Sequence, residues 1–315
     1  NGQLAKIDTN LKDITINKYN DLLDFPEISR NFLKLSDFTS NGVIAHNTSE
    51  FSDVLHLTIN QDKKIQKPIN IINVTNGLKN DRIVFPRIYI HAKENSSCKI
   101  YIQNIDSGAT CSINSVFEFF CEESSNIEVI QSSSLKKQEI IDSIFFHQKN
   151  NSQINFLSTT FGGKLYRSNI NVAINGEGCH NNFGILMLGS DDDHIDYNTS
   201  INHLFGHSNS SLSCKSLLKD SSKGVFNGKI LVAKESLGTD STLNNNNLLL
   251  SDKSEIQSNP QLEINCEEVK CSHGSTSGNL DKDALFYLQS RGISEVDAKG
   301  ILIEGFINKL ISSFD

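Results

Sequence analysis

Short runs of alternating apolar and polar residues dominate the middle of the chain, from about Gly42 to Cys271. Alternation with a period of two places every second side chain on one face, which is typical of β-strands. Asn, Ser, Gly or Asp follows each run, and these residues favour turns. The runs that predict strands are 54–59, 69–74, 83–91, 98–102, 112–120, 127–130, 139–146, 153–157, 168–174, 183–188, 212–217, 224–232 and 247–250. Many short strands without a long intervening helix predict an all-β core built as a sandwich, a barrel or a β-solenoid.

Two features of this core favour the solenoid. Proline, which cannot donate to a strand ladder, is scarce, since only Pro68 and Pro86 precede Pro260 in it. Asn is frequent, including the run Asn244–Asn247. Asn side chains at equivalent positions of adjacent coils stack and bond to one another, as they do in other stacked-strand assemblies. The pattern alone leaves the sandwich and the barrel open.

Both ends of the chain differ from this core. Residues 1–41 predict a short helical or irregular segment, residues 42–274 the β core, and residues 275–315 a helical subdomain. In the last of these, Asp281 is positioned to cap a first helix that stops at Gly292. Ser294, with Asp297 three residues later, starts a second helix that runs to about Phe314. The apolar residues of that helix recur at three- and four-residue steps and include Val296, Ile303, Phe306, Ile307 and Leu310.

Charge and cysteine usage narrow the class of protein. The chain has 315 residues and carries 37 acidic against 29 basic residues, a net charge of −8. Nucleic acid is therefore not expected as a partner, because phosphate binding needs a basic patch. No apolar run is long enough to predict a membrane span, and the first residues do not resemble a signal peptide. Seven cysteines without a Cys-x-x-Cys pair predict reduced thiols in the cytoplasm or in a similarly reducing organelle of the plastid type.

The segment Val269–Gly274, Val-Lys-Cys-Ser-His-Gly, carries the most informative chemistry. Cys271 and His273 are two residues apart, so in a strand both side chains share a face, roughly 6–7 Å apart. A thiol and an imidazole together suit a soft metal or an iron–sulfur fragment. Two ligands do not complete such a site, so the others must come from elsewhere in this chain or from a partner. Cys266 is interpreted as structural.

A second cluster combines carboxylates and imidazoles that would suit a hard or borderline divalent metal. It consists of Asp191, Asp192, Asp193, His194 and Asp196, followed by His203 and His207. Its spacing is not that of an EF-hand, and a solvated acidic turn is the favoured interpretation. The chain also contains no Gly-x-x-x-x-Gly-Lys-Ser/Thr loop, so it is not expected to bind ATP phosphates itself.

The last third of the chain resembles the SufB/SufD family of iron–sulfur cluster assembly proteins. The matching motifs are long and collinear. They comprise 224–230, Thr239-Asp240, 247–252, 260–264, 269–274, Leu280-Asp281 and 285–293. The Cys-Ser-His-Gly version of the segment is similar to the SufD branch of the family. Fainter similarity extends back to about Gly42, whereas the helical N-terminal region of the family is longer than residues 1–41.

The resemblance implies a right-handed parallel β-helix and a role as an assembly subunit rather than an enzyme. Such a subunit would pair with SufB through the C-terminal ends of their β-helices, where His273 would face a SufB cysteine. A transient iron–sulfur cluster or iron would be shared there, with Cys271 as a second candidate ligand. A SufC ATPase would dock on the C-terminal helices through Phe286, Tyr287, Phe306 and Leu310. The resemblance leaves flavin binding open, and it leaves open whether the isolated chain forms a homodimer.

Two other functions stay possible from the sequence. Parallel β-helices also occur as polysaccharide lyases and hydrolases, which need closely placed carboxylates on an exposed strand face. Alternatively, the chain is a self-sufficient homodimeric scaffold that binds a cluster through Cys271 and His273.

Overall fold

The fold is described from a computed structural model, in residues 13–17, 34–36, 39, 41–75, 82–106, 111–136 and 138–314. Most of the predicted N-terminal helical segment, including Leu22, Leu23, Phe25, Ile28 and Phe32, lies outside these residues.

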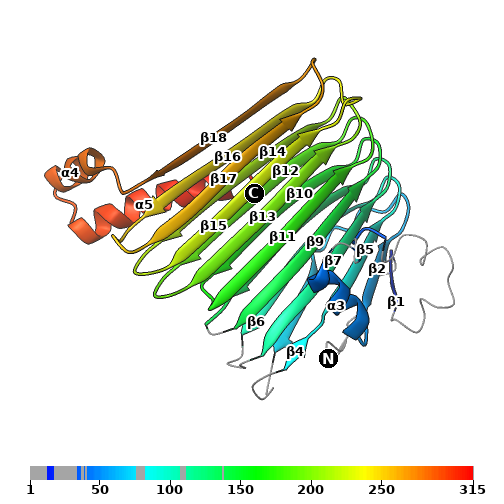
Figure 1. The fold of residues 1–315 in the computed structure, drawn as a ribbon, viewed down its shortest axis with the longest axis horizontal. Coiled ribbons are helices and arrows are strands. Elements are labelled where there is room, and N and C mark those ends of the chain that lie inside the picture. Colours follow the sequence, from blue (N-terminus) through cyan, green and yellow to red (C-terminus); the bar gives the residue numbers. More distant parts are fainter. Residues whose placement is uncertain are drawn as a thin grey trace.

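Two parallel sheets form the body of the molecule, and the chain passes from one to the other at almost every strand (Figure 1). Sheet A has the order β1-β2-β5-β7-β9-β11-β13-β15-β17, with β4 beside β7, and sheet B has the order β18-β16-β14-β12-β10-β8-β6-β3. The strands of sheet A are β1 (Ile14–Asn17), β2 (Leu55–Ile59), β4 (Ile83–Val84), β5 (Arg87–Ala92), β7 (Ser112–Cys121), β9 (Glu139–Gln148), β11 (Leu165–Ile174), β13 (His194–His203), β15 (Lys223–Val232) and β17 (Glu255–Ile264). Those of sheet B are β3 (Ile69–Thr75), β6 (Ser97–Asp106), β8 (Asn126–Ser134), β10 (Gln153–Phe161), β12 (His180–Gly189), β14 (Asn209–Leu218), β16 (Asp240–Leu249) and β18 (Lys270–Gly278). This arrangement confirms the β-helix among the three predicted architectures.

Strand register explains where the core lies. We call one strand of each sheet, with the corners that join them, a rung. Side chains at every second position point between the sheets and stack on the same position of the next rung. One such column in sheet B consists of Ile100, Val129, Phe156, Phe183, Leu212, Leu243 and finally His273. All members before His273 are buried, so the sequence alternation encodes an apolar interior that runs the length of the rod.

The corners between rungs use residues that tolerate a left-handed backbone. Asn95, Asn151 and His207 have positive φ values of 57°, 57° and 55°. Ser125 and Ser152 follow such residues, and each donates its hydroxyl to a carbonyl three residues earlier, at 2.7 Å. These local bonds satisfy the backbone where the ladder is interrupted, which is why Asn and Ser follow so many strands.

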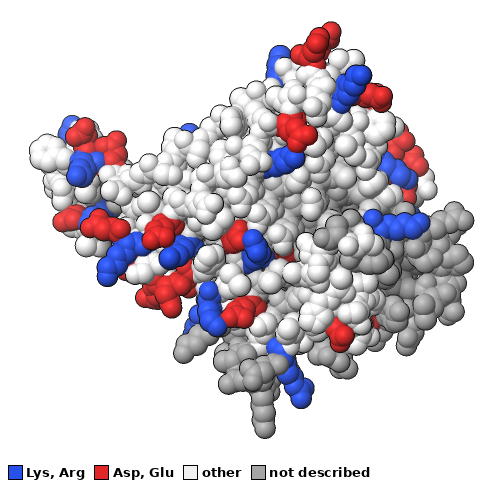
Figure 2. Space-filling view, viewed as in Figure 1, with Lys and Arg blue, Asp and Glu red and all other residues white. Residues whose placement is uncertain are grey.

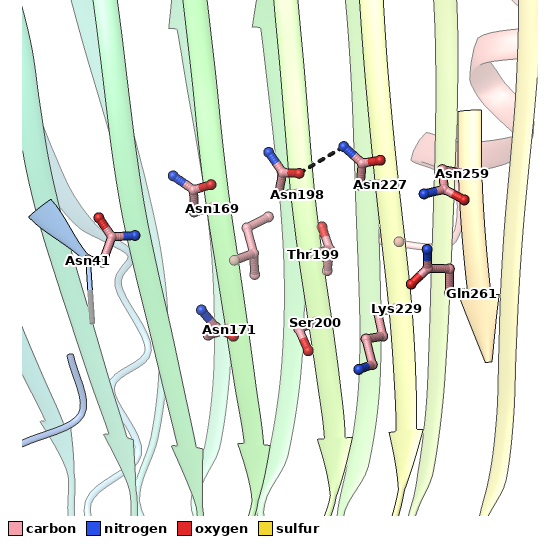
Figure 3. A pocket seen from close by; sticks show the side chains of 12 residues that line it. Asn41, Asn169, Asn171, Asn198, Thr199, Ser200, Asn227, Lys229, Asn259 and Gln261 are labelled. Carbon is pink, nitrogen blue, oxygen red and sulfur yellow. Dashed lines mark hydrogen bonds between the residues drawn. The ribbon is translucent and has the colours of Figure 1, made fainter. Parts of the chain in front are cut away.

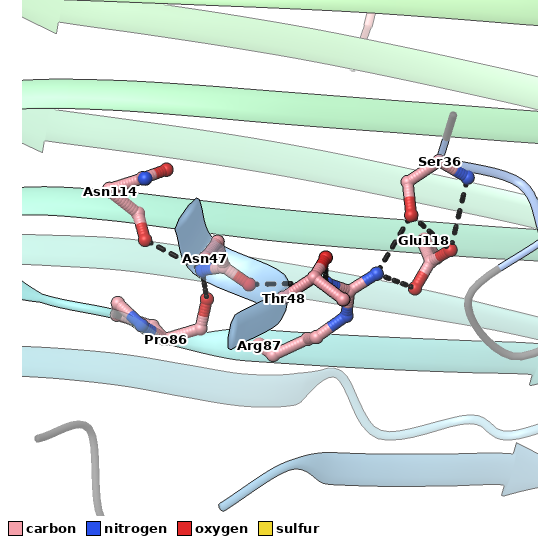
Figure 4. A network of polar contacts seen from close by, with 7 residues as sticks. All are labelled: Ser36, Asn47, Thr48, Pro86, Arg87, Asn114 and Glu118. Atoms are coloured by element: carbon pink, nitrogen blue, oxygen red, sulfur yellow. Dashed lines mark hydrogen bonds and ion pairs between the residues drawn. The ribbon is translucent and has the colours of Figure 1, made fainter. Parts of the chain in front are cut away.

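A short helix, α3 (Gly42–Glu50), covers the outer face of sheet A near its N-terminal end (Figure 1). Arg87 and Glu118 form an ion pair beneath it at 2.9 Å, and both side chains are fully buried. Arg87 also donates to Asn47 of α3 at 3.1 Å, and Ser36 donates its hydroxyl to Glu118 at 3.0 Å (Figure 4). The buried charges therefore attach two separate N-terminal pieces to the β-helix.

Two helices follow the last strand and form what we call the helical arm, α4 (Lys282–Ser290) and α5 (Glu295–Ile311). Asp281 caps α4, Gly292 has a φ of +87°, and Ser294 caps α5 by accepting from the Asp297 amide at 3.2 Å. Both predicted helices and their caps are thus confirmed. Within the described chain, no helix is long and apolar enough to cross a membrane.

The sequence prediction missed strands β1, β13 and β17 and helix α3, since no strand was predicted over 14–17, 194–203 or 255–264. Strand β1 pairs antiparallel with β2, although residues 1–41 were predicted to be helical or irregular. Apolar and polar side chains do alternate in its sequence, Ile-Thr-Ile-Asn, but four residues are too few to predict a strand from alternation. Helix α3 was not predicted either, because much of its stability comes from contacts with sheet A rather than from its own apolar pattern.

Candidate functional site: the open end of the β-helix

The β-helix ends in a rung whose outer edges have no partner strand among the described residues. β17 ends sheet A, and β18 ends sheet B. The charged residues of these two strands are Glu255 and Glu263 on β17 and Lys270 on β18, and the surface around the label of β18 in Figure 1 is mostly white in Figure 2. Because an unpaired strand edge exposes a row of backbone N–H and C=O groups, this end is suited to pairing with another strand.

Cys271 and His273 lie on β18 and share its inward face. Their neighbours on β16 are Ser241 and Leu243, which are both fully buried inside the β-helix. His273 is exposed and Cys271 is half-buried, because no further rung covers them. The predicted same-face geometry therefore exists, and it lies at the C-terminal end of the column, where inward side chains are left uncovered by the described rungs.

Cys271 differs from the other cysteines in being accessible. Cys98, Cys111, Cys121, Cys179, Cys214 and Cys266 are free and buried. Cys266 lies in the turn before β18, in agreement with the structural role expected for it. Partial burial raises the pKa of the Cys271 thiol, and Asp240 adds to the shift, while a backbone hydrogen bond at Ser241 opposes it. The free thiol is therefore mostly protonated at neutral pH, and a bound metal would have to displace the proton.

Polar side chains close the interior behind these two residues. Asn245 and Asn247, both buried, donate to each other at 3.1 and 2.7 Å. Ser258 of β17 donates to Asn245 at 2.6 Å and contacts the Ser275 hydroxyl of β18 at 2.9 Å. This network gives the open end a polar floor. The last rung can therefore face water or a polar partner without exposing the apolar core.

The described residues supply two candidate ligands to this site, Cys271 and His273. The described residues contain no group of three or more His, Cys, Asp or Glu side chains arranged to hold a metal. Thiolate and imidazole are ligands of iron and of iron–sulfur fragments, but such sites normally take four protein donors. The geometry therefore fits half of a site that is shared across an interface.

The helical arm carries a second exposed surface. Phe286, Tyr287 and Val296 have exposed fractions of 71%, 56% and 80%. The other two predicted docking residues lie differently. Phe306 is half-buried against Lys215, and Leu310 is only 2% exposed because it packs on the outer face of sheet B. Leu310 therefore attaches the arm to its own body.

The acidic cluster separates into unrelated contacts. Asp193 holds a corner together by accepting from the Ser190 and Gly163 amides at 2.8 and 2.9 Å. Asp196 pairs with Arg167 on the outer face of sheet A at 2.9 Å. His203 points into the β-helix and bonds to Ser210 at 2.8 Å, and burial lowers its pKa to about 4. The favoured interpretation, a solvated acidic turn, holds for Asp191 and Asp192 only, because His194, Asp196 and His203 belong to β13 and Asp193, Asp196 and His203 are buried.

A shallow pocket of about 260 Å³ lies on the outer face of sheet A (Figure 3). Its lining consists mainly of amides, including Asn169, Asn198, Asn227 and Asn259, which occupy equivalent positions on β11, β13, β15 and β17. Lys229 is the charged residue in the lining, and no carboxylate belongs to it. Glycoside cleavage by a carboxylate pair, which the polysaccharide-hydrolase alternative requires, has no support in this pocket.

Comparison with known proteins identifies the family of this chain. Residues 73–306 match the family described as SUF system FeS cluster assembly, SufBD core domain. The chain therefore belongs to the SufBD family of iron–sulfur cluster assembly proteins. Within the family it is similar to the iron–sulfur cluster assembly protein SufD of Escherichia coli, at 38% identity over 153 residues.

Two further relatives extend the similarity along the chain. A SufBD family protein of Synechocystis is 26% identical over 84% of this chain, and the chloroplastic protein ABCI7 of Arabidopsis thaliana is 25% identical over 83% of it. The chain spans only part of these proteins, since the matches cover 36% of the Escherichia coli protein, 61% of the Synechocystis protein and 57% of the Arabidopsis protein.

Proposed function

We propose that this chain is a SufD-like, non-catalytic subunit of an iron–sulfur cluster assembly complex. The observation that carries the proposal is the placement of His273 and Cys271 on the inward face of an unpaired terminal strand. In this account iron or a nascent cluster is the cargo, and His273 and Cys271 supply part of its ligands. A SufB-like sister subunit supplies the rest from the end of its own β-helix.

His273 is the principal ligand in this proposal. Its imidazole is exposed on the terminal strand, and imidazole nitrogen is a common metal ligand. Cys271 is half-buried and its thiol pKa is raised by that burial, so it acts second, once metal has displaced its proton.

The helical arm provides the docking surface for a SufC-like ATPase in the same proposal. Its support is the large exposure of Phe286 and Tyr287 on α4, and of Val296 on α5. Exposed aromatic side chains grouped on one element are typical of protein interfaces. Phe306 contributes at the border of this surface. The complex would work in the cytoplasm, or in a plastid, as the name of the Arabidopsis relative says of that protein.

Co-expression tests the assignment. A tagged copy of the chain is produced with its sister subunit and ATPase, and the molar mass of the purified species is measured by light scattering. The proposal predicts one complex that holds all three proteins. Elution of the tagged chain alone contradicts it, and elution as a homodimer that holds iron and sulfide supports the self-sufficient scaffold instead.

A further inference from the structure

Lys215 of β14 joins the helical arm to sheet B. It lies on the outer face of the sheet and is 5% exposed. Its ammonium donates to the Phe306 carbonyl of α5 and lies 4.6 Å from the centre of the Phe306 ring. Burial, followed by the nearby Lys309, lowers the pKa of Lys215. A lysine at this position loses hydration, so its contacts to α5 must replace that hydration.

A second attachment lies at the end of α5. Phe314 packs against Gly184 of β12, where an added Cβ would come within 2.5 Å of the Phe314 ring. Leu310 and Phe314 pack with Leu157 and Leu186 in one buried cluster. Asn182 also donates to the Ser313 carbonyl at 3.1 Å. The C-terminal half of α5 is thus fixed at two points, whereas α4 and the start of α5 extend away from the sheets (Figure 1).

Sheet B links Lys215 directly to the candidate site. Lys215 pairs in register with Asn246 of β16, which pairs with Thr276 of β18. The Asn246 amide donates to the Thr276 hydroxyl at 2.8 Å. Thr276 is on the same strand as His273. One rung, that of β16, therefore lies between the attachment of the arm on β14 and the terminal strand β18.

We propose that Lys215 is a positioning residue that couples the arm to the terminal strand. By holding Phe306 against β14, it makes α5 and sheet B move together, so that a displacement of the exposed arm reaches β18 through β16. The inference rests on the proposed docking of an ATPase on the arm. It adds that a change in the nucleotide state of that ATPase would be transmitted to the strand of His273 through Lys215.

Hydrogen exchange in the assembled complex tests this coupling. The exchange rate of the peptide 270–278 is measured with and without a non-hydrolysable ATP analogue, together with the affinity of the ATPase. In the wild type we expect the analogue to change this rate by about threefold or more. Lys215→Met is expected to remove most of that change while the ATPase still binds, because Met keeps the packing but not the cation. Lys215→Arg is expected to restore it.

Two further variants complete the design. Lys223→Met, at the exposed start of β15, is the matched control and is expected to behave as the wild type. Phe314→Ala removes the second attachment and is expected to reduce the nucleotide-dependent change as well. A wild-type complex without such a change, or a Lys215→Met complex that keeps it, overturns the inference. If the ATPase does not bind the wild type at all, the docking proposal fails, and the inference fails with it.

Discussion

At the residue scale, the interior of the β-helix is not uniformly apolar. Asp142 is fully buried and accepts hydrogen bonds from Ser115, from Gln131 at 2.8 Å and from Tyr166 at 3.0 Å. These donors come from three other strands, so one carboxyl group ties several rungs of both sheets together. Burial nevertheless raises the pKa of Asp142 to about 6 and outweighs the three hydrogen bonds that favour the charged form.

Asp142 therefore predicts a specific pH dependence of stability. Because its pKa is higher in the folded than in the unfolded state, the folded protein binds the proton more tightly. The stabilisation that Asp142 contributes is complete below pH 4 and is lost as the pH rises to about 6. The loss is roughly 3 kcal/mol, because the pKa values of the folded and unfolded states differ by about two units. Asp142→Asn lacks this titration, and any cost of its lost hydrogen bonds does not vary with pH. The difference in unfolding free energy between the two proteins, measured with urea from pH 4 to pH 7.5, is expected to shift in favour of the variant. A constant difference contradicts the prediction.

At the element scale, α3 depends on the buried pair of Arg87 and Glu118. Arg87→Met leaves Glu118 buried without its opposite charge, which typically costs about 3–5 kcal/mol. We expect this loss in urea unfolding, together with faster amide exchange in α3. Lys99→Met removes a half-exposed ion pair with Glu128 and is expected to cost less than about 1 kcal/mol. Equal losses in the two variants would show that the Arg87 network does not hold α3.

Mutation of α4 tests whether the helical arm is the docking surface for the ATPase. Phe286→Asp places a charge in the exposed apolar surface of α4, and its side chain has no buried role to lose. We expect the affinity for the ATPase to fall about tenfold or more, with an unchanged far-ultraviolet circular dichroism spectrum. Gln289→Asp adds the same charge at an exposed position of the same helix and is the control. Undiminished binding by Phe286→Asp would move the docking surface away from α4.

The elements differ in how far the sequence predicts them. Most strands and both arm helices were predictable, because their alternation and their caps at Asp281 and Ser294 are local signals, whereas strands β1, β13 and β17 were missed. Helix α3 was not, since Asn47 and Arg87 are 40 residues apart and their contact is a property of the fold. The spacing of the repeated corner serines, as at Ser96, Ser125 and Ser152, would have revealed the number of residues in a rung.

The candidate site was predictable only in part. The two-residue spacing of Cys271 and His273 was enough to place them on one face. Register alone reveals that His273 continues the column of Leu212 and Leu243, and that no strand in the described part of the chain pairs with β18 beyond it. Its exposure is a consequence of where the β-helix ends, which no local pattern encodes. The same limit applies to Leu310, whose apolar spacing fits equally a partner surface and sheet B.

At the scale of the whole molecule, the two ends of the rod differ. The outer face of sheet A is covered near its N-terminal end by α3 and by Leu35, which packs with Val116 and Phe145. Among the described residues both ends finish in unpaired strands, β1 and β3 at one end and β17 and β18 at the other, but only the second has a polar floor, with the arm attached nearby (Figure 1). An open strand edge is normally protected against association, so an unprotected one agrees with a partner that completes it.

The most direct test of this account is the iron and acid-labile sulfide content of the co-purified complex, prepared without oxygen. We expect His273→Ala to leave the composition of the complex unchanged and to lower its iron and sulfide several-fold, because a ligand of the shared site is lost. Ser272→Ala, on the outward face of the same strand, is the control and is expected to match the wild type. Unchanged iron and sulfide in His273→Ala would contradict the account and remove His273 from the site.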